Sequence, residues 1–282
     1  MPTLPTGSRS LTLANFDRKL RKGARSCDFS DLTFIDAYGL VGTACALLAA
    51  IDEGDRPPIE NPVREQVRTH LALMGFRDLL GELDYATDLP EAHPPERPDV
   101  LVPVAKLDRQ LAAEQLSHLL WEQLRQHADP QVLNATLEGL WELLANALEH
   151  SGAEAVVMGQ VYGRGEPPHH DDRVQVVIGD AGKGIRGSFL ESGRYEPRND
   201  ATAIELALEY LVTSVDDPGR GQGLFTTMEQ MAELQGDLVI RSGTSKITVG
   251  AGGKRDEAVP FLAGTVVCMS LPLYPGKPRD DT

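Results

Sequence analysis

A proline-rich segment divides this 282-residue chain into two unequal parts. Residues 88–103, DLPEAHPPERPDVLVP, hold five prolines in sixteen positions. Proline fixes φ and has no backbone N–H, so such a run is extended and poor in regular structure. We therefore predict a first domain over residues 1–87, a linker over 88–104, a second domain over 105–276 and a tail over 277–282.

Short apolar runs alternate with helical patterns before the linker. Period-two and β-branched stretches predict strands, and apolar residues spaced by three and four predict helices. The strands are expected at residues 11–13 and 27–35 with an extended piece at 56–60, and the helices at 16–22, 38–51 and 63–80. This order indicates a small α/β domain.

The part after the linker has a different order of elements. Helices are expected at residues 107–126, 132–150, 201–212 and 224–234, and strands at 156–162, 174–178, 238–241, 246–249 and 264–271. This order predicts an α+β sandwich, in which helices cover one face of a mixed, mostly antiparallel sheet.

Composition limits the class of protein and of ligand. The apolar fraction of 41% is that of a soluble globular protein, and the net charge of −15 disfavours nucleic acid and anionic membrane as partners. An anionic ligand such as a nucleotide would need a divalent cation beside it. The longest apolar run, residues 39–51, is too short to span a bilayer, and the three scattered cysteines favour a reducing compartment, so we expect a cytoplasmic protein.

One helix in the second part has polar residues along one face. The stretch GLWELLANALEHSG, residues 139–152, places Glu142, Asn146, Glu149 and His150 on that face. The Asn146 amide oxygen is a hard ligand suited to Mg²⁺, and Glu142 could polarise a water or a hydroxyl near the metal. Glu149 is expected to face solvent.

Two glycine-rich runs follow farther along the chain. In GDAGKGI, residues 179–185, Asp180 ends an apolar strand and could accept a hydrogen bond from an exocyclic amine such as that of adenine. In GRGQGL, residues 219–224, the glycines lead into a helix, whose first N–H groups could cradle a phosphate. Each run alone is a weak signal, and their order and spacing carry more information.

The three runs together resemble the N, G1 and G2 boxes of the GHKL ATPases, which share the Bergerat fold and include sensor histidine kinases, anti-sigma serine kinases and DNA gyrase. The matching residues are E-L-L-A-N-A-x-x-H from 142, D-A-G-K-G-I from 180 and G-R-G-Q-G-L from 219. The closing strand, GTVVCMSLP at 264–272, is also similar to this family's last element. The resemblance covers residues 106–274.

This resemblance implies that the second domain binds ATP with Mg²⁺. It implies a catalytic role for Glu142, a metal-binding role for Asn146 and a mobile lid over residues 186–218. The chain departs from the family pattern at two places. The lid is long and carries its own helix, and Gln222 stands where many members have Leu. His150 could bind phosphate or neutralise the helix C-terminus. The implied nucleotide-binding residues are Asn146, His150, Asp180, Gly182, Gly184, Ile185, Gly219, Arg220, Gly221, Gln222, Gly223, Leu224 and Thr265.

The first domain resembles the STAS fold of anti-anti-sigma factors over residues 10–85. In that family a Ser or Thr following an Asp is phosphorylated by a GHKL serine kinase. The corresponding positions here are Ala37 and Tyr38, after Asp36. Since alanine has no hydroxyl, the resemblance implies a degenerate STAS-like domain that acts in docking or folding.

The expected function is that of a Mg-ATP-binding regulatory protein, as a serine/threonine protein kinase of anti-sigma type with a STAS-type or sigma-factor-like partner. A non-catalytic, nucleotide-gated interaction scaffold is the alternative. A third interpretation, slow ATP hydrolysis coupled to dimerisation, leaves a homodimer open. A sensor histidine kinase is disfavoured because the surroundings of His118, SHLLWEQL, do not match a phosphoacceptor helix.

Overall fold

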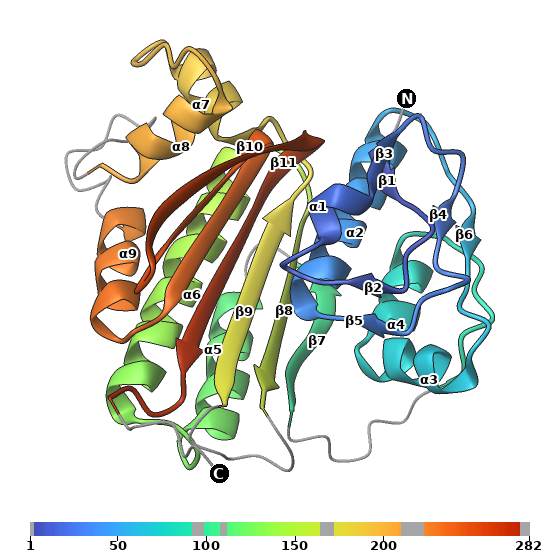
Figure 1. The fold of residues 1–282 in the computed structure, drawn as a ribbon, viewed down its shortest axis with the longest axis horizontal. Helices are drawn as coiled ribbons and strands as arrows, with labels where there is room; N and C mark the ends of the chain where they lie inside the picture. The colour runs from blue at the N-terminus through green and yellow to red at the C-terminus, as the bar shows by residue number, and fades with distance from the viewer. Residues whose placement is uncertain (1–2, 92–98, 108–111, 164–171, 210–222, 277–282) are drawn as a thin grey trace.

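The centre of the molecule is a five-stranded antiparallel sheet (Figure 1). The computed structural model describes the chain except for residues 1–2, 92–98, 108–111, 164–171, 210–222 and 277–282. The strands, in their spatial order, are β10 (Asp237–Gly250), β11 (Gly253–Pro272), β9 (Arg173–Asp180), β8 (Ala155–Tyr162) and β7 (Val100–Lys106). A mixed α+β fold with a mostly antiparallel sheet is thereby confirmed.

Three helices cover one face of this sheet: α5 (Ala112–Leu124), α6 (Pro130–His150) and α9 (Gly223–Glu233). The longest, α6, begins where the Asp129 side chain accepts a hydrogen bond from the Gln131 N–H at 2.9 Å, with Pro130 in the first turn. Its apolar stripe, which includes Leu140 and Leu144, joins one buried cluster with alternate residues of the sheet such as Val176.

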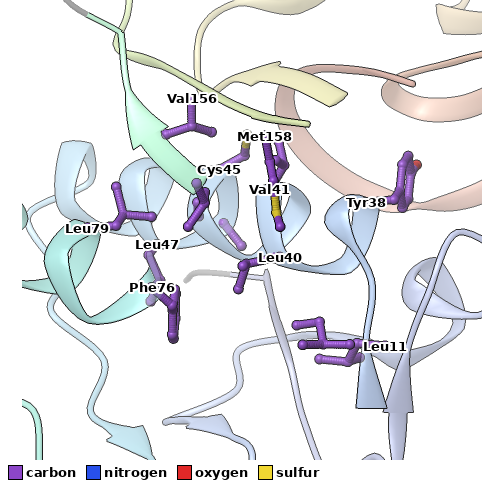
Figure 2. Packing of buried hydrophobic residues seen from close by; sticks show 14 of the residues in the cluster. Leu11, Tyr38, Leu40, Val41, Cys45, Leu47, Phe76, Leu79, Val156 and Met158 are labelled. Carbon is purple, nitrogen blue, oxygen red and sulfur yellow. The ribbon is translucent and has the colours of Figure 1, made fainter. Parts of the chain in front are cut away.

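A second helical layer covers the opposite face. Helix α2 (Ala37–Asp52) packs across β8, β9 and β11, and nearly all of its residues are buried. Val41 and Cys45 lie in one cluster with Val156 and Met158 of β8 (Figure 2). The fit at Cys45 is close, because a Cβ on Gly179 of β9 would come within 2.6 Å of the Cys45 Sγ. The sheet is thus buried between α2 and the α5–α6–α9 layer.

The rest of the N-terminal part surrounds α2 with short elements. Three two-stranded pairs form: β1 (Thr3–Pro5) with β3 (Leu20–Lys22), β2 (Ser10–Leu11) with β5 (Phe34–Ile35), and β4 (Cys27–Asp28) with β6 (Ile59–Glu60). Helices α1 (Phe16–Lys19), α3 (Glu65–Leu73) and α4 (Phe76–Glu82) complete this part.

Several predicted boundaries in the N-terminal half are wrong. The expected strand at residues 27–35 is two short strands, β4 and β5, and the expected helix at 16–22 ends at Lys19 and continues as β3. The expected helix at 63–80 is divided into α3 and α4 at Gly75, whose φ of +85° interrupts the helix. The predicted linker also ends earlier, because β7 begins at Val100 and pairs with β8. Pro103 is tolerated there since β7 is an edge strand.

The boundaries of the C-terminal half differ mainly in length. The two strands expected at 238–241 and 246–249 are one strand, β10, with register shifts at Ser242 and Gly243. The last strand, β11, begins at Gly253 and not at Gly264, so β10 and β11 form a long hairpin. Two further helices, α7 (Gly184–Ser192) and α8 (Asp200–Ala207), lie beyond one end of the sheet (Figure 1), and α7 was not predicted.

In the part of the chain that the structure describes, every helix is too short or too polar to pass through a lipid bilayer.

Candidate functional site

The polar pair of α6 forms a direct contact. Glu142 and Asn146 are one helical turn apart and both are half-buried. The Asn146 amide donates a hydrogen bond to the Glu142 Oε1 at 2.9 Å. Because the amide N–H group is used in this bond, the Asn146 carbonyl oxygen is the atom that remains suited to a hard cation such as Mg²⁺. These two oxygen-bearing side chains therefore form the acidic end of the candidate site.

Helix α9 begins against this pair. A Cβ on Gly223, the first residue of α9, would lie 1.7 Å from the Glu142 Cδ, so a larger residue there would displace the Glu142 carboxylate. The positive end of the α9 dipole is thus close to the Glu142 carboxylate. Leu224 packs against the cluster beneath α6 and α9. Gly219, Arg220, Gly221 and Gln222 lie outside the described residues, so the phosphate cradle predicted from them stays a prediction.

Asp180 is a buried carboxylate at the end of β9. Its side chain accepts a hydrogen bond from the Gly182 N–H at 2.9 Å, and it takes part in no ion pair among the described residues. Burial raises the pKa of Asp180 to about 7, and hydrogen bonds from the Gly182 and Thr265 backbones only partly oppose this effect. Such a carboxylate is well suited to accept a hydrogen bond from a neutral donor such as an exocyclic amine.

Thr265 and Gly264 lie beside Asp180 on the neighbouring strand. Thr265 pairs in register with Asp180 across β11 and β9. Gly264 has a φ of +78°, and a Cβ there would come within 1.9 Å of the Asp180 carbonyl oxygen. Glycine at position 264 therefore lets the backbone of β11 approach Asp180 more closely than a residue with a Cβ would allow.

Ser242 of β10 is a member of this group that sequence reasoning missed. Its hydroxyl accepts a hydrogen bond from the Ile185 N–H at 3.0 Å and lies 3.2 Å from the Thr265 hydroxyl. It also donates to the Gly264 carbonyl oxygen at 3.2 Å. The available signal was the interruption of a buried apolar strand by the polar run RSGTS, which follows Ile240.

The end of α6 connects the two groups. A Cβ on Gly182 would come within 2.1 Å of the carbonyl oxygen of Ser151, directly after α6, and the Lys183 N–H donates to the same oxygen at 3.3 Å. From Glu142 to Ser151 the chain rises along α6 by about 13 Å at ~1.5 Å per residue. His150 is the last residue of α6, and the direction of its side chain lies outside what the structure describes.

The described part of the predicted lid is anchored on β10. Asp200, at the start of α8, accepts hydrogen bonds from the Thr244 N–H at 2.8 Å and from the Thr244 hydroxyl at 2.7 Å. Helix α7 begins with Gly184 and Ile185, directly after the Asp180 turn. Two cationic side chains of this region have partners within it: Lys183 forms an ion pair with Glu191, and the Arg186 Nε donates to the Pro197 carbonyl oxygen at 3.1 Å.

Several other polar and aromatic residues of α5 and α6 are exposed. His118 and Glu149 are exposed. The tryptophans Trp121 of α5 and Trp141 of α6 are 42% and 45% exposed, so neither is enclosed between the two helices. The Arg125 guanidinium lies 4.9 Å from the Trp121 ring centroid.

The segment compared with a phosphorylation site is buried. Ala37 and Tyr38 form the first turn of α2, and neither has any exposed surface. Asp36 caps the helix by accepting a hydrogen bond from the Gly39 N–H at 2.8 Å. The Tyr38 hydroxyl is therefore out of reach of a modifying enzyme in the folded chain.

The fold and the site together describe an α+β protein with a buried acid at a strand end and a polar pair on the helix beside it. The sequence matches no model of a known protein family, and no curated protein is significantly similar to it. In the part of the chain that the structure describes, no three His, Cys, Asp or Glu side chains gather as they would for a protein-only metal site. A divalent cation here would depend on the ligand for most of its oxygens.

Proposed function

We propose that this chain is a Mg-ATP-binding regulatory protein of the GHKL type. The observation that carries the proposal is the position of Asp180. It is a buried carboxylate without a partner cation among the described residues, it lies beside Thr265, and the end of α6 connects it to the Glu142–Asn146 pair. On this proposal the adenine base would lie at Asp180 and the phosphates at Glu142, with α6 between them.

The two ends differ in chemistry in the way that a nucleotide requires. The buried Asp180 and the half-buried Thr265 offer hydrogen-bonding groups, which suits the exocyclic amine of adenine. Asn146 and Glu142 offer hard oxygen atoms next to the first turn of α9, which suits a phosphate-bound cation and its phosphates. Bound Mg²⁺ would neutralise phosphate charge, which a protein of net charge −15 otherwise repels.

The base end is tested by calorimetry with Mg-ATP on the wild type and on Asp180→Asn. Asparagine has the same shape but presents an N–H₂ group to the adenine amine, so we expect the affinity to fall at least tenfold, an effect of about 1.4 kcal/mol. The matched control is Asp78→Asn, an exposed acid on α4, which should bind like the wild type. Equal affinity of Asp180→Asn and wild type would refute this assignment.

We further propose that bound ATP serves protein phosphorylation. In this proposal Glu142 would orient or deprotonate an incoming hydroxyl, and general-base groups of this kind contribute roughly 10²–10⁴-fold to rates. The hydroxyl would belong to a separate STAS-type or sigma-factor-like protein, since Ala37 and Tyr38 are buried in this chain. The test is incubation with labelled Mg-ATP and candidate STAS-type proteins, and label on a Ser or Thr of the partner supports the kinase.

A nucleotide-gated scaffold is the second candidate, and one contact favours it. The Glu142 carboxylate accepts a hydrogen bond from Asn146 and packs against Gly223, so its interactions are those of a residue that fixes α9. In the labelling experiment, tight ATP binding without transfer or phosphate release supports the scaffold. Release of phosphate alone supports slow hydrolysis.

A further inference from the structure

The hairpin of β10 and β11 is irregular next to Asp180. Ser242 pairs with Thr265, but the next residue, Gly243, pairs with Leu262, so residues 263 and 264 have no partner in the register. A second register shift follows between Gly243 and Ser245. Such bulges bend a strand locally and redirect its side chains, and they are common next to functional sites.

One side of this bulge is tied to the N-terminal part by buried ionic groups. The Arg241 Nε lies 2.7 Å from the Asp17 Oδ1, and the Lys246 Nζ lies 3.0 Å from the Asp17 Oδ2. Asp17, Arg241 and Lys246 are 4%, 1% and 6% exposed. Asp17 belongs to α1, more than two hundred residues away in the sequence.

Arg241 also binds the bulge itself. Its guanidinium donates to the carbonyl oxygens of Gly243 at 3.2 Å and of Leu262 at 3.5 Å, and to that of Pro260. These carbonyls come from both strands around the irregular pairs. The position of α1 and the shape of the bulge are therefore fixed by the same side chain.

The other side of the bulge is part of the base end of the candidate site. Ser242 follows Arg241 directly, and successive residues of a strand point to opposite faces. The Ser242 hydroxyl forms hydrogen bonds with the Ile185 N–H and the Gly264 carbonyl and lies beside the Thr265 hydroxyl. The backbone of Gly264 in turn lies close against Asp180. A rotation of this short stretch of β10 would move Arg241 and Ser242 together.

We propose that this bulge couples the base end of the ATP site to the docking of residues 10–22, with Ser242 as the positioning residue on the site side and the Asp17–Arg241 pair on the other. The inference rests on the proposed ATP site. Thermodynamic coupling is reciprocal, so ATP should tighten the packing of α1 and its flanking strands, and loss of the Asp17 contact should weaken ATP binding.

The test uses hydrogen exchange and calorimetry on the full chain. In the wild type, saturating Mg-ATP should slow amide exchange over residues 10–22 by about threefold or more. Asp17→Asn and Ser242→Ala should each abolish this protection and weaken ATP binding about fivefold, the lower end of usual coupling factors. Asp31→Asn, an exposed acid of the same N-terminal part, should behave like the wild type.

The outcomes separate the two proposals. ATP that binds to the wild type without changing exchange over residues 10–22 overturns the coupling and leaves the ATP site intact. A wild type that binds no ATP removes the proposed function, and the coupling with it. If Asp17→Asn does not fold, because Arg241 is then buried without its partner, Ser242→Ala and the wild-type exchange data still decide the question.

Discussion

The carboxylate of Glu142 lies directly against the backbone of Gly223, so that a methyl group at residue 223 would come within 1.7 Å of the Glu142 Cδ. These residues are eighty-one positions apart, at the middle of α6 and at the start of α9. The contact brings the helix that carries Asn146 and the end of the second glycine-rich run to one place.

Replacing Gly223 with alanine should displace the Glu142 carboxylate from its contact with Asn146 and loosen the packing of α9 on α6. The added Cβ overlaps the Glu142 carboxylate, and overpacking of this kind typically costs about 1–3 kcal/mol of unfolding free energy. Urea denaturation measures this loss, and ATP binding should weaken as well. The matched control is Gly252→Ala in the β10–β11 turn, where a Cβ would meet no atom within 4 Å. Equal losses in both variants would contradict the contact.

Replacing Glu142 with glutamine should separate binding from transfer. Glutamine keeps an oxygen that accepts the Asn146 hydrogen bond, so the fold should be retained. The affinity for ATP should change by less than about threefold. Loss of the basic carboxylate should lower phosphate transfer to a partner by about 10²-fold or more. Single-turnover labelling measures this step. Unchanged transfer would show that Glu142 only fixes α9.

Stability should increase as the pH falls from 8 to 6. Burial raises the pKa of Asp180 to about 7 and that of Asp36 to about 6, both from an ordinary value of 3.8. Between 3.8 and these values the folded state binds more protons than the unfolded state, so stability is lost as the pH rises through the folded pKa. Asp180→Asn removes its share, and should be more stable than the wild type at pH 8 by about 1–3 kcal/mol.

Denaturation of the wild type and Asp180→Asn across this pH range isolates that share, because every other titrating group is common to both proteins. The difference in unfolding free energy should shrink as the pH falls below 7. A difference in unfolding free energy that does not change with pH would mean that burial does not raise the pKa of Asp180.

The packing of α2 on the sheet can be tested by a pair of substitutions. Gly179→Ala places a Cβ within 2.6 Å of the Cys45 Sγ and should destabilise the fold by about 1–3 kcal/mol. Cys45→Ala removes that sulfur, so the double variant should recover part of the loss. A double-mutant cycle by thermal denaturation measures the interaction. Purely additive effects would argue against the contact.

The long periodic helices were the most predictable part of the fold. Helix α6 and helix α2 carry clear apolar patterns and side-chain caps at Asp129 and Asp36, and both lie within two residues of their predicted bounds. The short pairs around β4 and β5 were not predictable, because two-residue strands leave no period to detect. Helix α7 was missed because a glycine-rich start does not look helical.

The site was only partly visible in the sequence. Motif order singled out Glu142, Asn146 and Asp180, and the structure brings Thr265 beside Asp180 through strand register. Ser242 and the buried Asp17–Arg241 pair were not found, because their partners are distant in sequence and a lone serine or arginine carries no pattern. The burial of α2 on the sheet was also missed, since an apolar helix does not show which surface it covers.

The face of the sheet that α2 covers determines whether the two halves of the chain can exist separately. Val156, Met158, Val177 and Cys268 are buried in one cluster with α2 and other elements of the N-terminal part. A fragment that starts after the proline-rich segment would present this apolar surface to water, and we expect it to aggregate or to capture another hydrophobic surface. We therefore expect the two halves of the chain to fold well only when they are present together, and not as exchangeable independent domains.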